Sequence, residues 1–149
     1  MIKPAFEMAQ EFSEGLAAVK LRGKWGYIDH TGKPIIEPQY DEAWEFSEGL
    51  AAVKITGRYG YIDAKGIQQI GPRFEFARRF SEGLAAVDIG GKMGFIDKSG
   101  KLVIEPQFLL ALEFSQGQAQ VKLFGTNLKT PGKGAFIDRK GRILRLVER

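Results

Sequence analysis

The stretch FSEGLAAVKLRGKWGYIDHTG, residues 12–32, is the pattern from which the rest of the chain is built. Its first eight residues recur unchanged at 46–53 and 80–87, and in the altered form FSQGQAQV at 114–121. Each copy begins 34 residues after the one before it. Because such a period makes neighbouring copies form equivalent contacts, the sequence predicts four similar structural units. We place these repeat units at 2–35, 36–69, 70–103 and 104–147, within a single repeat domain covering 1–149.

The composition favours a soluble domain rich in turns. The 149 residues include 19 glycines, and 44% of them are hydrophobic. Because the chain has no cysteine, a disulfide framework and a thiolate metal site are excluded. The net charge of +4 is too small to indicate nucleic-acid binding. No apolar run is long enough to span a bilayer and no secretion signal is recognisable, so a soluble and by default cytoplasmic chain is expected.

The glycines argue against helix-pair repeats, which can share this period. Glycines at 15, 23, 26 and 32 would each cost about 1 kcal/mol in a helix interior. The segments 16–21 and 24–29 instead flank Arg22-Gly23, and a two-residue loop ending in glycine is typical of a tight β-hairpin. This turn pairs Val19 with Gly26. One face of the hairpin then carries Ala17, Val19, Leu21 and Ile28, and the other carries Leu16, Ala18, Lys20, Trp25 and Tyr27.

A third strand is expected after each hairpin. It follows an Asp-x-x-Gly turn, first seen at 29–32, whose aspartate accepts local backbone hydrogen bonds. The connector that leads to the next octet, such as 40–46, is too short for an independent helix, and we expect it to be irregular. We therefore predict an all-β fold of tandem three-stranded antiparallel β-meander repeats, in four copies, forming an open twisted array. A small closed β-propeller-like arrangement is the alternative.

These motifs together resemble the bacterial WG-repeat family, also called KWG repeats after a triplet seen here as Lys24-Trp25-Gly26. The resemblance rests on the octet, the hairpin, the segment 25–29, the glycine turn and IEPQY at 36–40, and it covers essentially the whole chain. It implies an all-β repeat protein with no general catalytic activity and no agreed ligand, so it supplies no functional residues. Later copies depart from the pattern, with Tyr59, Met93 and Gly134 at the tryptophan position and Ala135 at the glycine position.

Recurring carboxylates are the most obvious catalytic candidates. Acid–base catalysis needs two carboxyl groups in unlike environments, whereas repetition gives every copy the same environment. We therefore expect turn and solvation roles, no catalytic residue and no enzyme activity. His30 is the only histidine, so a common zinc site cannot form, and no metal or cofactor is expected. The carboxylates in question are Glu14, Glu48 and Glu82 in the octets and Asp29, Asp63, Asp97 and Asp138 in the turns.

Positions that vary within the constant frame are better candidates for binding. Tryptophan and arginine are favoured in interfaces, so we predict a non-enzymatic scaffold that binds a protein or peptide partner. Binding of carbohydrate or of the cell envelope through the aromatics is the alternative. A structural interpretation, in which Trp44 fills space between repeats and the two arginines are a solvated pair, also stays open. The predicted binding residues are Trp44, Arg78 and Arg79 in the connectors, with Trp25 and Tyr59 at the tryptophan position of the repeat.

The fourth copy carries seven extra residues between Leu123 and Phe136. We expect 125–133 to form an exposed and mobile loop in place of the two-residue turn. Such a loop is either functional or merely tolerated. A terminal repeat is also expected to be atypical because it caps the stack, so capping and recognition both remain open for this segment.

Overall fold

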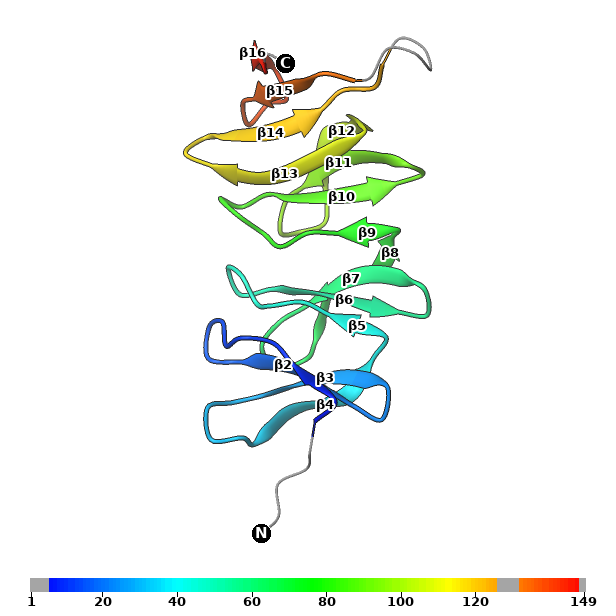
Figure 1. Cartoon of the computed structure of the whole chain (residues 1–149), viewed down its shortest axis with the longest axis vertical. Coiled ribbons are helices and arrows are strands. Elements are labelled where there is room, and N and C mark those ends of the chain that lie inside the picture. Colours follow the sequence, from blue (N-terminus) through cyan, green and yellow to red (C-terminus); the bar gives the residue numbers. More distant parts are fainter. Residues whose placement is uncertain (1–5, 126–131, 148–149) are drawn as a thin grey trace. The chain divides into compact units, whose positions relative to one another are not determined.

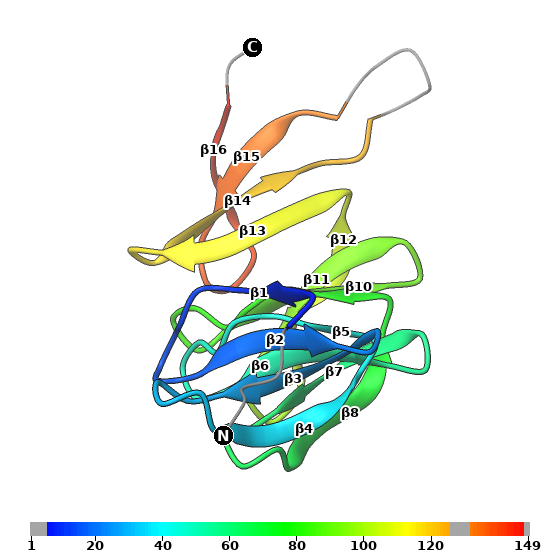
Figure 2. The same cartoon turned by 60° about the horizontal axis from the view of Figure 1, so that its bottom comes forward.

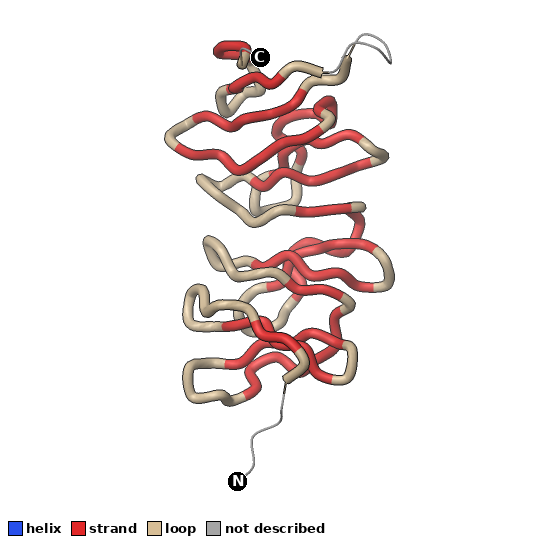
Figure 3. The backbone as a smooth tube through the Cα atoms, in the orientation of Figure 1, coloured by secondary structure: helices blue, strands red, loops and turns tan. Residues whose placement is uncertain are grey.

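The computed structural model of the chain describes residues 6–125 and 132–147. Within these ranges the chain consists of strands, turns and loops, and no helix occurs (Figure 3). The predicted all-β class is confirmed. The expected loop at 125–133 falls largely on 126–131, which lie outside the described residues.

The strands form four-stranded antiparallel sheets in which strands adjacent in sequence are adjacent in space (Figures 1 and 2). In the described part of the chain there are four such sheets, and none of them is closed. Their strands are β1 (Met8–Ala9), β2 (Ala17–Leu21), β3 (Lys24–Ile28) and β4 (Pro34–Tyr40); β5 (Glu42–Ala43), β6 (Ala51–Ile55), β7 (Arg58–Ile62) and β8 (Gln68–Phe74); β9 (Phe76–Ala77), β10 (Ala85–Ile89), β11 (Lys92–Ile96) and β12 (Leu102–Phe108); and β13 (Leu110–Ser115), β14 (Gln118–Lys122), β15 (Gly134–Ile137) and β16 (Ile143–Leu146).

Each sheet has one strand more than the three expected, because the connector is not wholly irregular. Met8 and Ala9 pair with Lys20 and Val19, and the amide of Glu7 donates to the carbonyl of Lys20. A connector that runs along β2 satisfies its backbone groups in this way. The sheets therefore begin in the connector and span 8–40, 42–74, 76–108 and 110–146. Four strands is also the usual number in a propeller blade.

The hairpin register predicted from Arg22-Gly23 is confirmed. Val19 lies opposite Gly26, and Ala17 lies opposite Ile28. Both turn residues have positive φ, 55° at Arg22 and 79° at Gly23, as a type I′ turn requires.

The chain divides into two compact halves, Met1–Arg73 and Phe74–Arg149, which we describe separately. In the first half one core joins two sheets, and the two predicted hairpin faces meet in it. The face of the first sheet that holds Tyr27 packs with the face of the second sheet that holds Val53, the counterpart of Val19. The prediction of one folding domain stays a prediction. The core comprises Leu16, Ala18, Trp25, Tyr27, Ile36, Tyr40, Ala43, Phe46, Ala51, Val53 and Ile62.

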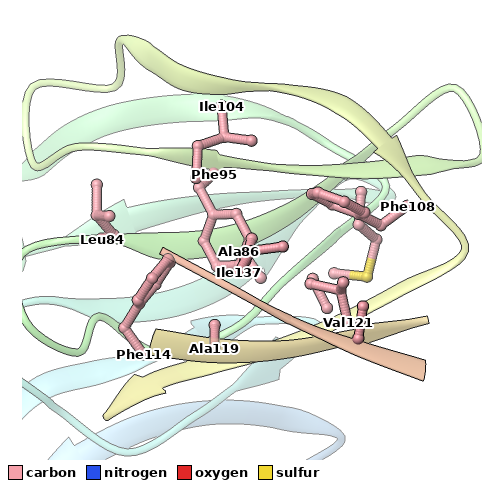
Figure 4. Close-up of a cluster of buried hydrophobic side chains, with 12 residues drawn as sticks. Leu84, Ala86, Phe95, Ile104, Phe108, Phe114, Ala119, Val121 and Ile137 are labelled. Atoms are coloured by element: carbon pink, nitrogen blue, oxygen red, sulfur yellow. The ribbon is translucent and has the colours of Figure 1, made fainter. Parts of the chain in front are cut away.

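The second half repeats this packing between its own two sheets (Figure 4). Phe95 meets Phe114 edge to face with ring centroids 4.9 Å apart, and in the first half Tyr27 meets Phe46 in the same way at 4.9 Å. Such aromatic pairs stabilise by about 0.5–1.5 kcal/mol beyond the area they bury. Phe46 and Phe114, each of which opens an octet, are therefore contacts between one repeat and the ring of the preceding repeat.

Glycine stands at the WG position because the backbone of the neighbouring strand leaves no room for a side chain. Between the pairs Trp25–Tyr40 and Tyr27–Ile36, strand β4 bulges, so that three of its residues lie opposite Gly26. A Cβ on Gly26 would collide with the backbone of Ile36 and Pro38. The fourth copy has Ala135 at this position and Val147 in place of the proline, so glycine and proline are lost together.

A second contact between repeats, which we call the Ser-Glu bridge, explains the SEG part of the octet. Ser13 Oγ donates to the carbonyl of Phe46 at 2.7 Å, while the Glu14 carboxylate accepts from the amides of Glu48 and Gly49 at 2.7 and 2.9 Å. These amides belong to the next type I′ turn, in which both residues have positive φ.

The bridge recurs in the second half. Glu82 accepts from the amides of Gln116 and Gly117 at 2.6 and 3.0 Å, and Ser81 Oγ donates to the carbonyl of Phe114 at 2.7 Å. Charge-assisted hydrogen bonds of this kind are shorter and stronger than neutral ones.

The outer face of the last sheet differs from its counterparts. Arg145 stands where Ile36 stands in the first copy, lies 4.1 Å from the Phe136 ring centroid, and donates to Gln118 Oε1 at 3.1 Å. Gln118 and Gln120 replace the leucine and alanine of the octet. This polar face is what is expected of a capping repeat.

The collision at the WG glycine predicts a large effect from a single methyl group. In Gly60→Ala the new Cβ would lie 2.5 Å from the carbonyl oxygen of Ile70, so the free energy of unfolding should fall by about 1–3 kcal/mol. Gly71→Ala, in the facing strand, meets open space and should change it by less than about 0.5 kcal/mol. Denaturant melts of both variants check this, and equal losses would contradict the close approach.

The Ser-Glu bridge predicts a position-dependent effect of one chemical change. Glu82→Gln leaves one acceptor oxygen for two amides and removes the charge, so the free energy of unfolding should fall by about 1 kcal/mol. Gln116→Glu, the reverse change at the equivalent place in the last octet, should alter it by less than about 0.5 kcal/mol. Thermal melts at matched ionic strength would compare the two, and a neutral Glu82→Gln would contradict the bridge.

Candidate functional site

Trp44 follows the short strand β5, and its side chain is partly open to solvent, with 39% of the residue surface exposed. Its indole hydrogen-bonds the Tyr59 hydroxyl, which donates to Glu42 Oε1 at 3.3 Å. Burial raises the pKa of Tyr59 and the Glu42 carboxylate adds to this, so the phenol stays protonated as a donor. The structure thus brings two of the predicted binding residues into contact. Trp44 is partly exposed, and Tyr59 is buried behind it.

The remaining aromatic candidate lies in the core. Trp25 is 8% exposed and packs in the core of the first half, and Tyr59 is 4% exposed. Neither residue presents a ring face to solvent. Among the predicted aromatics, Trp44 is the exposed one.

The two arginines lie in the second half beside one carboxylate. Glu113 Oε2 is 3.7 Å from Arg78 Nη1 and 3.8 Å from Arg79 Nε. The Arg78 guanidinium also lies 5.8 Å from the centroid of the Phe76 ring. The exposed fractions of the two side chains are 28% for Arg78 and 49% for Arg79, so the pair is accessible to a partner although it is held in an ion-pair network.

The variable connector position has a constant backbone. The amide of Gln10 donates to the carbonyl of Ala18 at 2.9 Å, that of Trp44 to Ala52 at 3.0 Å, and that of Arg78 to Ala86 at 2.9 Å. The same backbone bond therefore holds three different side chains. The identity of the side chain is not needed to form the bond that fixes its place.

The turn aspartates have the structural role expected of them. Asp29 Oδ1 accepts from the Thr31 hydroxyl at 2.6 Å and from the amides of Thr31 and Lys33 at 2.9 and 3.0 Å. These bonds, above all that from the Thr31 hydroxyl, lower the pKa of Asp29. The pKa values of Asp63, Asp97 and Asp138 are lowered in the same manner by their own turns. The octet glutamates Glu14 and Glu82 are engaged in the Ser-Glu bridges.

No group of three or more histidine, cysteine, aspartate or glutamate side chains that could hold a metal ion occurs among the described residues. His30 stacks on Phe12, with ring centroids 4.2 Å apart and an interplanar angle of 15°. Within the same residues, the structure contains no helix long and apolar enough to cross a membrane.

The Ser-Glu bridge was not predicted from the sequence, although a signal for it exists. Glu14, Glu48 and Glu82 change to Gln116 only in the last octet, where no further octet follows in the sequence. A residue that changes where its successor is missing is expected to contact that successor.

Solved structures share the fold at low sequence identity. The crystal structure of a eukaryotic initiation factor matches with a TM-score of 0.67 and 12% identity, over 100% of this chain and 45% of that chain. The extracellular domain of a putative hybrid two component system from B. thetaiotaomicron matches with a TM-score of 0.55 and 14% identity, over 96% of this chain and 22% of the other. The chain thus spans less than half the length of either protein, and identities this low indicate the fold alone.

No curated protein matches the sequence. The family described as WG containing repeat matches four times, at residues 1–25, 25–59, 59–92 and 93–123. These matches cover most of the chain and agree with the periodic contacts that bind one octet to the next. The chain belongs to the WG containing repeat family.

Proposed function

We propose that this chain is a non-enzymatic scaffold that binds a protein or peptide partner through side chains that differ between its repeats. The observation that carries the proposal is the connector position at which one backbone hydrogen bond holds Gln10, Trp44 or Arg78. Because the same backbone bond forms with each of these side chains, their variation is available for recognition.

The exposed groups suit a polypeptide partner. Tryptophan and arginine are the residue types most enriched among those that dominate binding energy in protein interfaces. Trp44 offers a partly exposed indole whose position is fixed by Tyr59, and Arg79 offers a half-exposed guanidinium. An apolar side chain of a partner would pack on the indole, and an acidic side chain would replace Glu113 on the arginine.

Carbohydrate binding has less support. It would require open aromatic faces on which sugar rings can stack, and of the predicted aromatics Trp25 and Tyr59 are buried whereas Trp44 is partly exposed. A glycan array run beside a pull-down from lysate would separate the two functions. Specific glycan capture without protein capture would overturn the proposal.

The proposal predicts that binding and stability separate at Trp44. Trp44→Ala, alone or with Arg78→Ala, should weaken capture of a pulled-down partner at least about tenfold, since truncating such residues commonly costs 2 kcal/mol or more of binding. The melting temperature should fall by only a few degrees, because the ring is partly exposed. Ile67→Ala, at an apolar residue of the first half with 55% of its surface exposed, is the control and should leave capture unchanged.

Titration calorimetry with the purified partner would measure the affinities. Unchanged affinity in the Trp44→Ala variant would contradict binding at this position. A loss of folding would make Trp44 a residue that fills space between repeats.

A further inference from the structure

The turns that join the third and fourth strands of each sheet share one backbone conformation and differ in charge. Each begins with an aspartate whose side chain accepts the amides of the residues two and four places later. The turns 29–33 and 63–67 carry one lysine each, whereas 97–101 carries two lysines and 138–142 carries three cations. The cationic residues of the two turns in the second half are Lys98, Lys101, Arg139, Lys140 and Arg142.

The two cationic turns lie on the same side of the second half. Each joins equivalent strands, and the two sheets pack in one core. A side-chain carbon built on Gly141 would lie 3.0 Å from Ile104, three residues after Lys101, so the last turn packs on the strand that follows the preceding turn. All five cationic residues are exposed. The middle residues of the turns 29–33 and 63–67 are exposed as well, so this exposure is a property of the turn itself.

The two arginines of the last turn are held by contacts that leave most of their donors available. Arg142 Nε donates to Asp138 Oδ2 at 2.8 Å. Arg139 Nη1 donates to the carbonyl of Glu82. Because a guanidinium has five N–H donors, each side chain keeps further donors in a fixed orientation. Between them, the Lys140 side chain makes no hydrogen bond or ion pair with the other residues that the structure describes.

We propose that the turn 138–142 binds an acidic segment of a polypeptide partner, with the turn 97–101 extending the cationic surface. An arginine pairs with a carboxylate through two parallel hydrogen bonds, and the partner's carboxylates take the donors that Asp138 and Glu82 leave. Asp138 itself already accepts three hydrogen bonds from its own turn, so the turn keeps a net positive charge. This inference rests on the proposed function, and it names a partner chemistry and a second place on the chain.

A short acidic peptide fits this surface better than a nucleic acid does. The cations are confined to two turns, and each turn also contains an aspartate. A phosphate backbone is bound by a longer stripe of lysine and arginine, and the net charge of +4 on the whole chain is small for that purpose.

The test uses the whole chain, isotope-labelled for nuclear magnetic resonance, and a hexaglutamate peptide with both ends blocked as the probe. The backbone amide signals of 139–142 should move and saturate as the peptide is added, with smaller shifts at 98–101. The signals of 30–33 and 64–67, in turns of the same conformation, should not move and are internal controls. Unmoved signals at 139–142, or equal shifts in all four turns, would overturn the site.

A matched pair of variants separates a defined site from attraction by net charge. Lys140→Gln should weaken hexaglutamate binding about threefold, the size expected from one exposed ion pair. Lys65→Gln removes the same charge at the equivalent place of the second turn and should leave binding unchanged. Arg142→Lys keeps the charge but loses the planar fork, and should also weaken binding. Equal losses from Lys65→Gln and Lys140→Gln would contradict a site at the last turn.

Single-stranded RNA and vesicles of anionic phospholipid are the competing ligands. Binding of either that exceeds hexaglutamate binding and is weakened by Lys140→Gln would overturn the polypeptide as the partner. Failure of the hexaglutamate experiment would leave the proposed binding function standing, because that function is decided by the calorimetry on the Trp44 variants.

Discussion

The structure depends on hydrogen bonds between the side chains of one repeat and the backbone groups of the next repeat. A type I′ turn directs two amides outward, and in an isolated hairpin only water would accept from them. Here the carboxylate of the preceding octet accepts from both, as Glu14 does for the turn at Glu48 and Gly49. The serine beside it satisfies the carbonyl of the following phenylalanine, which is buried against an aromatic ring. Each repeat is therefore locally incomplete, and its stability includes a nearest-neighbour term, as in other repeat proteins.

A second constraint acts within each repeat and ties two distant sequence positions together. The bulge in strand β4 brings Pro38, which cannot donate to the ladder, close to the middle of strand β3. Only a residue without a side chain leaves room there, as Gly26, Gly60 and Gly94 show. Where the proline is absent, in the fourth copy, alanine is tolerated at position 135 and is fully buried. The glycine at the WG position thus reflects close contact between the backbones of two neighbouring strands.

Much of this fold could be predicted from the sequence because the decisive signals are local. Arg22-Gly23 fixed the hairpin register, and Asp29 with Gly32 indicated the following turn. The strand Met8–Ala9 could not be found, since two residues carry no periodicity. At the candidate site the repeat pattern located the variable positions, but it did not distinguish the exposed Trp44 from the buried Trp25 and Tyr59. Both faces of the hairpin are apolar, and exposure depends on how sheets pack, which no single strand encodes.

The Ser-Glu bridge also gives each half a polarity that bears on the order of its repeats. Within each half the earlier repeat supplies the carboxylate and the later repeat supplies the amides. The last octet differs, because Gln116 and the polar face around Arg145 offer no equivalent junction. Exchanging the two repeats of the second half would place Gln116 where Glu82 stands, and the carboxylate that holds the turn amides would be lost. The order of the repeats within a half is therefore part of what this contact specifies.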